Sequence, residues 1–183
     1  MNDIASREPI GARDGRWALI AAPVCLLLGF ASGRLSNSGY GNPWFDALDK
    51  PGFMPPGWAF GAAWSVLYLL LGVAVALVLG ARSHSLRRTA IILFVVQFAT
   101  NLVWSPLFFA AHQVRIAFWW IVLMFVLGAI TARAFGRIRP LAGWLFLPYL
   151  AWLVIAGALN WEIARLNPGA ERLVPSASAS QIG

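Results

Sequence analysis

The residues of this sequence that could do chemistry are aromatic rings and side-chain amides that recur at helical spacing. Three groups each fall on one face of a helix, because successive members lie three or four positions apart, with Ser105 directly after Trp104: Trp64 and Tyr68; Gln97, Asn101, Trp104, Ser105 and Phe108; and Tyr149, Trp152, Ala156 and Asn160. Such faces suit a large, flat, apolar ligand with polar edges, since rings stack on its faces and amides bond its rim. Ordinary helix packing, with the amides bonded between helices, explains the same pattern and stays open as the alternative.

Acidic side chains are missing from the long central part of the chain. All seven Asp and Glu residues lie at or before Asp49 or at or after Glu162. This gap excludes paired-carboxylate catalysis, acid-based proton relays and hard-cation sites from the central region. Cys25 is the single cysteine, which excludes a disulfide within the chain and a CxxC redox or zinc site. His84 and His112 have no partner at metal-ligand spacing, so we expect neither a metal site nor an obligatory cofactor. Phosphate-binding, dinucleotide-binding and serine-nucleophile motifs are absent as well.

The elements that must position these side chains are membrane-spanning helices. Of the 183 residues, 60% are hydrophobic and 11% are charged, far from the balance of a soluble domain. Five apolar runs approach the roughly 20 residues that a helix needs to cross the hydrocarbon core: about 17–33, 57–81, 89–111, 116–132 and 141–163. Three connections are short, so the helices that they join must be antiparallel neighbours. We predict an all-α membrane protein, a five-helix bundle over residues 17–165, with polar, mobile tails at 1–16 and 166–183.

The first connection, residues 34–56, is longer and irregular. Its glycines and prolines, Pro51 among them, block regular helix over much of its length, apart from one short turn expected at 45–49. It also carries Trp44, Phe45 and Phe53, more aromatic side chains than a plain solvated linker needs. We interpret this connection as an ordered cap over one mouth of the bundle. An interfacial aromatic belt without a lid role is the alternative.

Basic residues give the chain a net charge of +7, but they gather at the ends of the apolar runs. This placement indicates topology signals and argues against a nucleic-acid partner. The N-terminus and the second and fourth connections hold nine of the 14 Lys and Arg residues, and the opposite side holds five. In an inner membrane, this bias places the N-terminus inside and the aromatic cap outside. We expect an integral protein of a bacterial cell membrane, with inner or outer membrane left open.

The first apolar run allows two interpretations. It follows basic residues and ends in small ones, as a signal peptide does. Trp17 and Arg34 bracket it as interface anchors, however, and Gly29 and Gly33 have the GxxxG spacing that suits close helix packing. We therefore predict a retained helix.

Two prolines fall inside apolar runs. Pro106 lies in the third run and Pro148 in the fifth, and each removes a backbone hydrogen bond. Kinks at these positions would splay the helices and make room for a cavity. The alternative interpretation is that these prolines have no such role, because proline is common in membrane helices.

Four stretches together resemble the signature of a known family. Residues 44–56, WFDALDKPGFMPP, resemble the first-loop pattern W-Y-x-x-L-x-K-P-x-W-x-P-P of the TspO/MBR family, the tryptophan-rich sensory proteins related to the mitochondrial translocator protein. Residues 60–68 match F-x-x-x-W-x-x-L-Y, residues 101–109 resemble N-x-x-W-[ST]-P-x-F-F, and residues 148–160 carry P-Y-x-x-W followed by L-N. The resemblance covers about residues 17–167, and several motifs in order make it specific.

The resemblance implies a five-helix membrane receptor, usually a homodimer, whose pocket lies beneath the first loop. It implies porphyrins and related tetrapyrroles as ligands, sterols and benzodiazepine-type drugs as further ones, and a regulatory role in tetrapyrrole metabolism or stress response. Carried over by position, the pocket residues are Trp64, Tyr68, Asn101, Trp104, Trp152 and Ala156, and the lid residues are Trp44, Phe45 and Pro51; the helical pattern adds Phe108 and Tyr149. In some members, tryptophans at the positions of Trp64 and Trp152 are linked to light-dependent porphyrin breakdown.

The sequence departs from the family pattern at three positions. Phe45 replaces a Tyr and Phe53 replaces a Trp, which alters any hydrogen bond or stack from those positions. Trp161 replaces the Tyr of a sterol-recognition pattern, so we expect no sterol binding. Three functions stay open: a porphyrin-binding sensor, which we favour; a light- and oxygen-dependent porphyrin-degrading enzyme; and a porphyrin transporter, for which the missing acids disfavour a proton-coupled carboxylate mechanism.

Overall fold

The computed structural model describes residues 12–173, and its helices confirm the predicted fold class. In chain order the elements are α1 (Ala12–Leu35), α2 (Pro43–Asp46), α3 (Gly57–Gly80), α4 (Arg87–Ser105), the π-helical turn η1 (Pro106–Ala110), α5 (Val114–Ile138), α6 (Pro140–Trp144), α7 (Leu147–Leu166) and the 3-10 turn η2 (Ala170–Arg172). Five segments of the described chain are long and apolar enough to span a membrane: α1, α3, α4 with η1, α5, and α6 with α7. The outer parts of the predicted tails, 1–11 and 174–183, lie outside the described residues.

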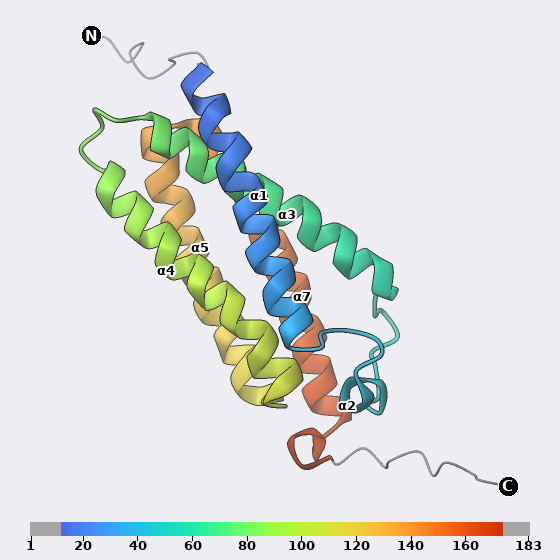
Figure 1. Ribbon diagram of the computed structural model, residues 1–183. Helices are drawn as coiled ribbons and strands as arrows, with labels where there is room; N and C mark the ends of the chain where they lie inside the picture. Colours follow the sequence, from blue (N-terminus) through green and yellow to red (C-terminus); the bar gives the residue numbers. More distant parts are fainter. Residues whose placement is uncertain (1–11, 174–183) are drawn as a thin grey trace, which may run out of the picture.

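Glycines allow the helices to pack closely where they cross. α1 packs along α3, and α5 packs against both α4 and α7 (Figure 1). At the contact of α1 with α3, a Cβ atom added to Gly72 would lie 2.8 Å from the backbone nitrogen of Ala22. Where α6 turns back onto α5, a Cβ atom on Gly143 would lie 2.8 Å from the Cα atom of Gly136. Backbones in close contact are a main source of helix association in lipid, where no hydrophobic force acts between helices.

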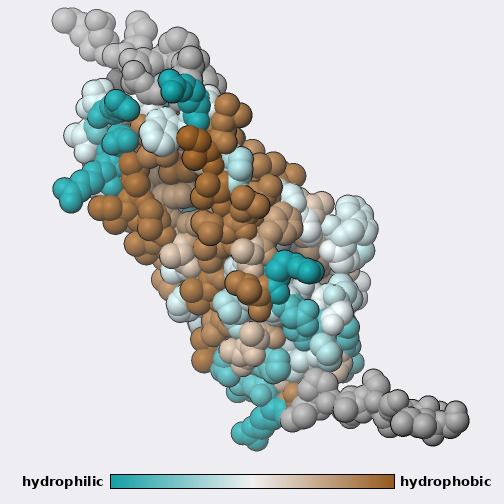
Figure 2. Space-filling view, in the orientation of Figure 1, coloured by the Kyte–Doolittle hydropathy of each residue, from teal (hydrophilic) through white to brown (hydrophobic). Residues whose placement is uncertain are grey.

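The outer surface of the bundle is apolar, as contact with lipid requires. Leu19, Trp119 and Val154 expose 78%, 68% and 60% of their surface. Figure 2 shows hydrophobic side chains over the middle of one face, with hydrophilic residues gathered toward the two ends. This arrangement matches a hydrocarbon core between two headgroup regions. The chain is therefore an integral membrane protein.

Two helices extend furthest beyond their predicted ends. α1 begins at Ala12, before the predicted start at Trp17, and α5 continues to Ile138, past the predicted end at residue 132. The prediction ended the fourth span where charge begins, at Arg133. Arginine is a good helix former whose stem can lie along apolar surface, and Phe135 in the same stretch is fully buried. Most of the expected connection after the fourth span is therefore helix.

Both predicted interruptions by proline are present as breaks in regular α-helix. Pro148 has no N–H to bond the carbonyl of Trp144, and the fifth span is divided just before it into α6, which ends at Trp144, and α7, which begins at Leu147. At Pro106, α4 gives way to η1, where the N–H of Ala111 bonds the Pro106 carbonyl across five residues. The wider turn carries Phe108 in a buried position. The two prolines thus change the helix geometry at the end of α4, where η1 begins, and at the start of α7, next to α6.

The segment after α7 is part of the fold, which corrects the predicted tail from residue 166 onward. Ala170 in η2 is buried, and its carbonyl accepts a 2.9 Å hydrogen bond from the indole Nε1 of Trp44. The two residues are 126 positions apart, so no local pattern could reveal the contact. The C-terminal segment up to residue 173 therefore packs against the first connection.

Candidate functional site

A cavity of about 440 Å³ lies within the bundle against the connection between α1 and α3. Its walls come from α1, α3, α4 with η1, α5 and α7, and the connection contributes side chains such as Tyr40, Phe45 and Met54. Sites for small organic ligands have volumes of about 300–1,000 Å³ and mostly apolar walls with a few polar groups. The volume and the wall chemistry are those of such a site.

Aromatic rings from α3 and α7 form one wall of the cavity. Trp64 and Tyr68, one helical turn apart on α3, stack with ring centres 5.1 Å apart and planes inclined by 25°. Trp152 of α7 meets Trp64 edge to face at 6.4 Å, and it meets Phe60 in the same way at 5.8 Å. These offset and edge-to-face contacts hold the rings in fixed orientations. The wall therefore offers flat apolar surface from two different helices.

A chain of hydrogen bonds ties three helices together behind this wall. The Tyr149 hydroxyl of α7 donates to Oδ1 of Asn101 on α4 at 3.2 Å, and Nδ2 of Asn101 donates to the Tyr68 hydroxyl on α3 at 3.1 Å. All three side chains are buried. Polar groups in an apolar interior must be paired, and the pairing here fixes the position of the Tyr68 ring. Asn101 thus holds the aromatic wall in place.

The facing wall comes from α4 and η1. The rings of Trp104 and Phe108 stack at 5.2 Å with planes inclined by 14°. Phe45 from the connection meets Phe108 at 6.3 Å, edge to face. The π-helical turn therefore does more than end α4, because it places Phe108 between the cavity and the overlying connection.

Two buried polar atoms of cavity-lining residues have no hydrogen-bond partner among the described residues. They are the indole Nε1 of Trp104, a donor, and the amide Oδ1 of Asn160, an acceptor. Nδ2 of Asn160 is paired, since it donates to the carbonyl of Val114 at 2.8 Å. An unpaired buried polar group costs about 1–3 kcal/mol, so a ligand or water that bonded these atoms would relieve that cost. Within residues 12–173, no group of three His, Cys, Asp or Glu side chains is placed to hold a metal ion.

The connection over the cavity is ordered by its own short helix, α2. Oδ1 of Asn42 accepts hydrogen bonds from the N–H groups of Trp44 at 3.0 Å and Phe45 at 3.2 Å. Nδ2 of the same side chain donates to the carbonyl of Phe109 in η1 at 3.3 Å. Asn42 is thus both the N-cap of α2 and its link to the bundle.

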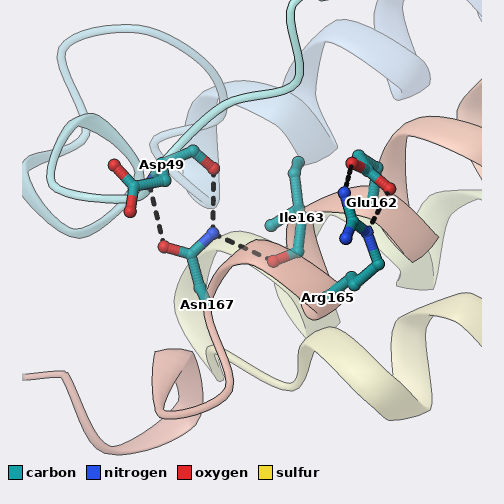
Figure 3. A network of polar contacts seen from close by, with 5 residues as sticks. All are labelled: Asp49, Glu162, Ile163, Arg165 and Asn167. Atoms are coloured by element: carbon teal, nitrogen blue, oxygen red, sulfur yellow. Dashed lines mark hydrogen bonds and ion pairs between the residues drawn. The ribbon is translucent and has the colours of Figure 1, made fainter.

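A second link joins the connection to the end of α7 (Figure 3). Nδ2 of Asn167 donates to the carbonyls of Asp49 at 2.8 Å and Ile163 at 2.9 Å, and its Oδ1 accepts from the N–H of Asp49 at 2.8 Å. Glu162 and Arg165 form an ion pair on the neighbouring turn of α7. The connection is therefore held from both sides, by η1 and by α7, as the predicted cap requires.

Lys50 closes the connection on itself. Its ammonium donates to the carbonyls of Phe45 at 2.8 Å, Leu48 at 3.0 Å and Asp46 at 3.2 Å, and it lies 4.8 Å from the centre of the Phe45 ring. The charge is thereby paired with backbone dipoles and a ring face. Lys50 fixes the orientation of Phe45, the ring that reaches the cavity.

The structure brings eight of the eleven predicted site residues to the cavity wall: Phe45, Trp64, Tyr68, Asn101, Trp104, Phe108, Trp152 and Ala156. It places Trp44, Pro51 and Tyr149 elsewhere, all three buried. Trp44 packs on Phe108 and bonds Ala170, and Tyr149 bonds Asn101, so each supports a lining residue from behind. Pro51 is buried within the connection.

Sequence reasoning missed the wall that α1 supplies. Gly29 lines the cavity, and a Cβ atom there would overlap the ring of Tyr68. Arg34 and Phe60 also line it. Gly29 stood out only through its spacing from Gly33, which did not show which helix it meets. Phe60 had a usable signal, since it lies four positions before Trp64 on the same helical face.

Comparisons with known proteins agree over the whole bundle. A family model for the TspO/MBR family matches residues 21–166, a range that contains every cavity-lining residue. Protein CrtK of Rhodobacter capsulatus is 37% identical over 140 residues, which cover 76% of this chain and 86% of that protein. The tryptophan-rich protein TspO of Chlorobaculum tepidum is 34% identical over 146 residues, 79% of this chain and 92% of that protein. The translocator protein of Sus scrofa is 37% identical over 147 residues, 77% of this chain and 84% of that protein.

Proposed function

The chain belongs to the TspO/MBR family, as its motifs predicted, and from this membership and its cavity we propose that it is a membrane receptor that binds porphyrins within the helix bundle. The proposal includes a regulatory role in tetrapyrrole metabolism or stress response. It also includes benzodiazepine-type drugs as further ligands and assembly as a homodimer, both implied by the family resemblance. The excess of basic residues on one side places the N-terminus inside if the membrane is an inner one.

The aromatic wall carries this proposal. A porphyrin is a flat apolar macrocycle with polar groups at its centre and edge. Trp64, Tyr68 and Trp152 offer ring faces and edges from two helices in fixed orientations. Such rings stack on a macrocycle and contribute about 0.5–1.5 kcal/mol per pair beyond the apolar area that they bury. The unpaired Nε1 of Trp104 and Oδ1 of Asn160 add one donor and one acceptor for polar groups of the ligand.

One observation favours a photochemical activity as the second candidate. The rings of Trp64 and Trp152 meet at 6.4 Å in the cavity wall, so a porphyrin stacked there would touch indoles from both helices. A photoexcited porphyrin can generate oxidants from dioxygen, and a nearby indole can donate an electron. No acid or base is needed for this chemistry, which fits the absence of Asp and Glu between Lys50 and Trp161.

A titration with protoporphyrin IX tests the receptor proposal. Purified protein in a neutral detergent is titrated while quenching of tryptophan fluorescence is followed, with Trp152→Phe and Asn101→Ala beside the wild type. Trp119→Phe is the matched control, because Trp119 is 68% exposed on the lipid-facing side and does not line the cavity. We expect saturable, stoichiometric quenching in the wild type and the control. If either test variant loses about 1.4 kcal/mol of binding free energy, its dissociation constant for protoporphyrin IX rises tenfold.

Quenching that rises linearly without saturation, and equally in all four proteins, would contradict the proposal, because the porphyrin would then be partitioning into the micelle. Illumination of the saturated complex in air separates receptor from enzyme. A new porphyrin product that Trp64→Phe or Trp152→Phe abolishes would establish the photochemical activity. Flux of porphyrin into sealed liposomes that carry the protein would instead support a transporter.

A further inference from the structure

Arg34 carries the one formal charge among the described residues that line the cavity. It lies in the last turn of α1, and its side chain is exposed. Within residues 12–173 its guanidinium forms no hydrogen bond or ion pair. A guanidinium has five N–H donors in a planar fork that matches a carboxylate, so this group is free to bind an anion.

The cavity changes from apolar to polar along α1. At its inner level, Gly29 packs against the ring of Tyr68. One turn further on, Ser32 Oγ donates to the carbonyl of Leu102 on α4 at 2.6 Å. Arg34 follows at the end of the helix, about 7.5 Å beyond Gly29 at the usual rise of 1.5 Å per residue. Because Arg34 both lines the cavity and is exposed, we infer that its guanidinium stands at the mouth of the cavity.

Other polar groups accompany Arg34 at this mouth. Asn37 and Ser38 also line the cavity, and Ser38 Oγ lies 3.0 Å from Ser105 Oγ on α4. No Asp or Glu side chain is among the described lining residues. Asp46 does not line the cavity, and its Oδ2 accepts a 2.9 Å hydrogen bond from the N–H of Gly41. The mouth therefore offers a positive charge and hydroxyl groups, with no lining carboxylate to compete for the charge.

We propose that Arg34 binds an acidic edge of the ligand and makes the cavity selective for amphipathic macrocycles that carry carboxylate side chains. The inference rests on the proposed function and specifies its ligand class. The apolar face of the ligand stacks against the aromatic wall while its carboxylates lie at the mouth, where the guanidinium donates two parallel hydrogen bonds to one of them. Arg34 is then a specificity-determining residue.

Paired ligands test this assignment. Protoporphyrin IX carries carboxylate side chains, and its dimethyl ester is neutral but has the same macrocycle. Both are titrated in neutral detergent against the wild type, Arg34→Gln and Arg34→Lys. Arg115→Gln is the control, because Arg115 is an exposed arginine at the same end of the bundle that does not line the cavity.

We expect Arg34→Gln to weaken binding of the diacid about threefold to fivefold and binding of the diester less than twofold, since a well-aligned ion pair at an exposed site contributes a factor of this order. Arg34→Lys keeps most of the preference for the diacid, because the charge remains, and Arg115→Gln changes neither ligand. Added salt reduces the difference in affinity between the diacid and the diester in the wild type.

Two results would overturn the assignment while leaving the proposed function standing. If Arg34→Gln weakened binding of the diacid and of the diester equally, Arg34 would only shape the mouth of the cavity. No change for either ligand would show that Arg34 does not contact the bound porphyrin. A wild type that binds neither porphyrin saturably would instead refute the proposed function, and the assignment with it.

Discussion

Replacement of Gly29 by alanine probes the contact between α1 and the aromatic wall. A Cβ atom at this position would overlap the ring of Tyr68. That ring is only 7% exposed, it stacks on Trp64 at 5.1 Å, and its hydroxyl accepts a hydrogen bond from Asn101 at 3.1 Å. The ring can move aside only into the cavity that it lines, and this shift would break the stack on Trp64 or the hydrogen bond with Asn101. Accommodating the methyl group requires either a shift of α1 or the loss of the contacts of Tyr68.

The size of the effect follows from two opposing contributions. Forcing an extra methyl group into a packed site costs about 1–3 kcal/mol. Replacing a glycine with alanine inside a helix stabilises the folded state by about 0.5–1 kcal/mol, because alanine loses less backbone entropy on folding. Gly33→Ala, one turn along α1, provides the matched control: the nearest atom to a new Cβ is 3.9 Å away on Ser38, so only the favourable contribution applies. The two variants should differ by about 1–3 kcal/mol, with Gly29→Ala the less stable.

Thermal unfolding of both variants in one detergent, followed by tryptophan fluorescence, measures this difference. At about 2–4 °C per kcal/mol for a chain of this size, Gly29→Ala should melt several degrees below Gly33→Ala. Its affinity for protoporphyrin IX should also fall, since Tyr68 is displaced from the wall. A Gly29→Ala protein that is as stable as Gly33→Ala and binds protoporphyrin IX with unchanged affinity would refute the packing of α1 against Tyr68. It would also refute the role of α1 as a wall of the cavity.

Two further substitutions test other contacts. Gly72→Ala should destabilise the bundle by about 1–3 kcal/mol, because its Cβ would meet the backbone of Ala22, which cannot rotate away. The control is Gly61→Ala on the same helix, where a new Cβ has no atom within 4 Å. This control should be neutral or slightly stabilising in the same melting assay. Asn167→Ala should release the connection over the cavity by removing both hydrogen bonds to Asp49, and hydrogen exchange of residues 47–53 should then quicken at least several-fold while exchange in the centre of α3 stays slow.

The five spans and the family could be predicted from the sequence, since long apolar runs and several ordered motifs each encode a local property. Trp64, Tyr68 and Asn101 could be placed on inward faces for the same reason: aromatic and amide groups at helical spacing mark a face that avoids lipid. The motif positions likewise indicated that the first connection would carry Phe45 to the cavity.

Other features depend on how the helices are rotated and where distant segments meet. Tyr149 shares a helical face with Trp152, yet it points at Asn101 rather than into the cavity, because that hydrogen bond decides its direction. The burial of Ala170 beneath Trp44 joins residues 126 positions apart. The wall from α1 includes Gly29, Ser32 and Gly33, small residues that carry no periodic signal of their own. Arg34 has the pattern of an interface anchor in the sequence, and only its place at the cavity mouth distinguishes it.

The position of a bound porphyrin shows whether the cavity is its binding site. A structure of the protein in a lipid nanodisc, determined after saturation with protoporphyrin IX, would show it. We predict one macrocycle inside the bundle, in contact with Trp64, Trp104 and Trp152 and covered by the connection that carries Phe45. A macrocycle found only on the lipid-facing surface, with the cavity free of it, would contradict the account.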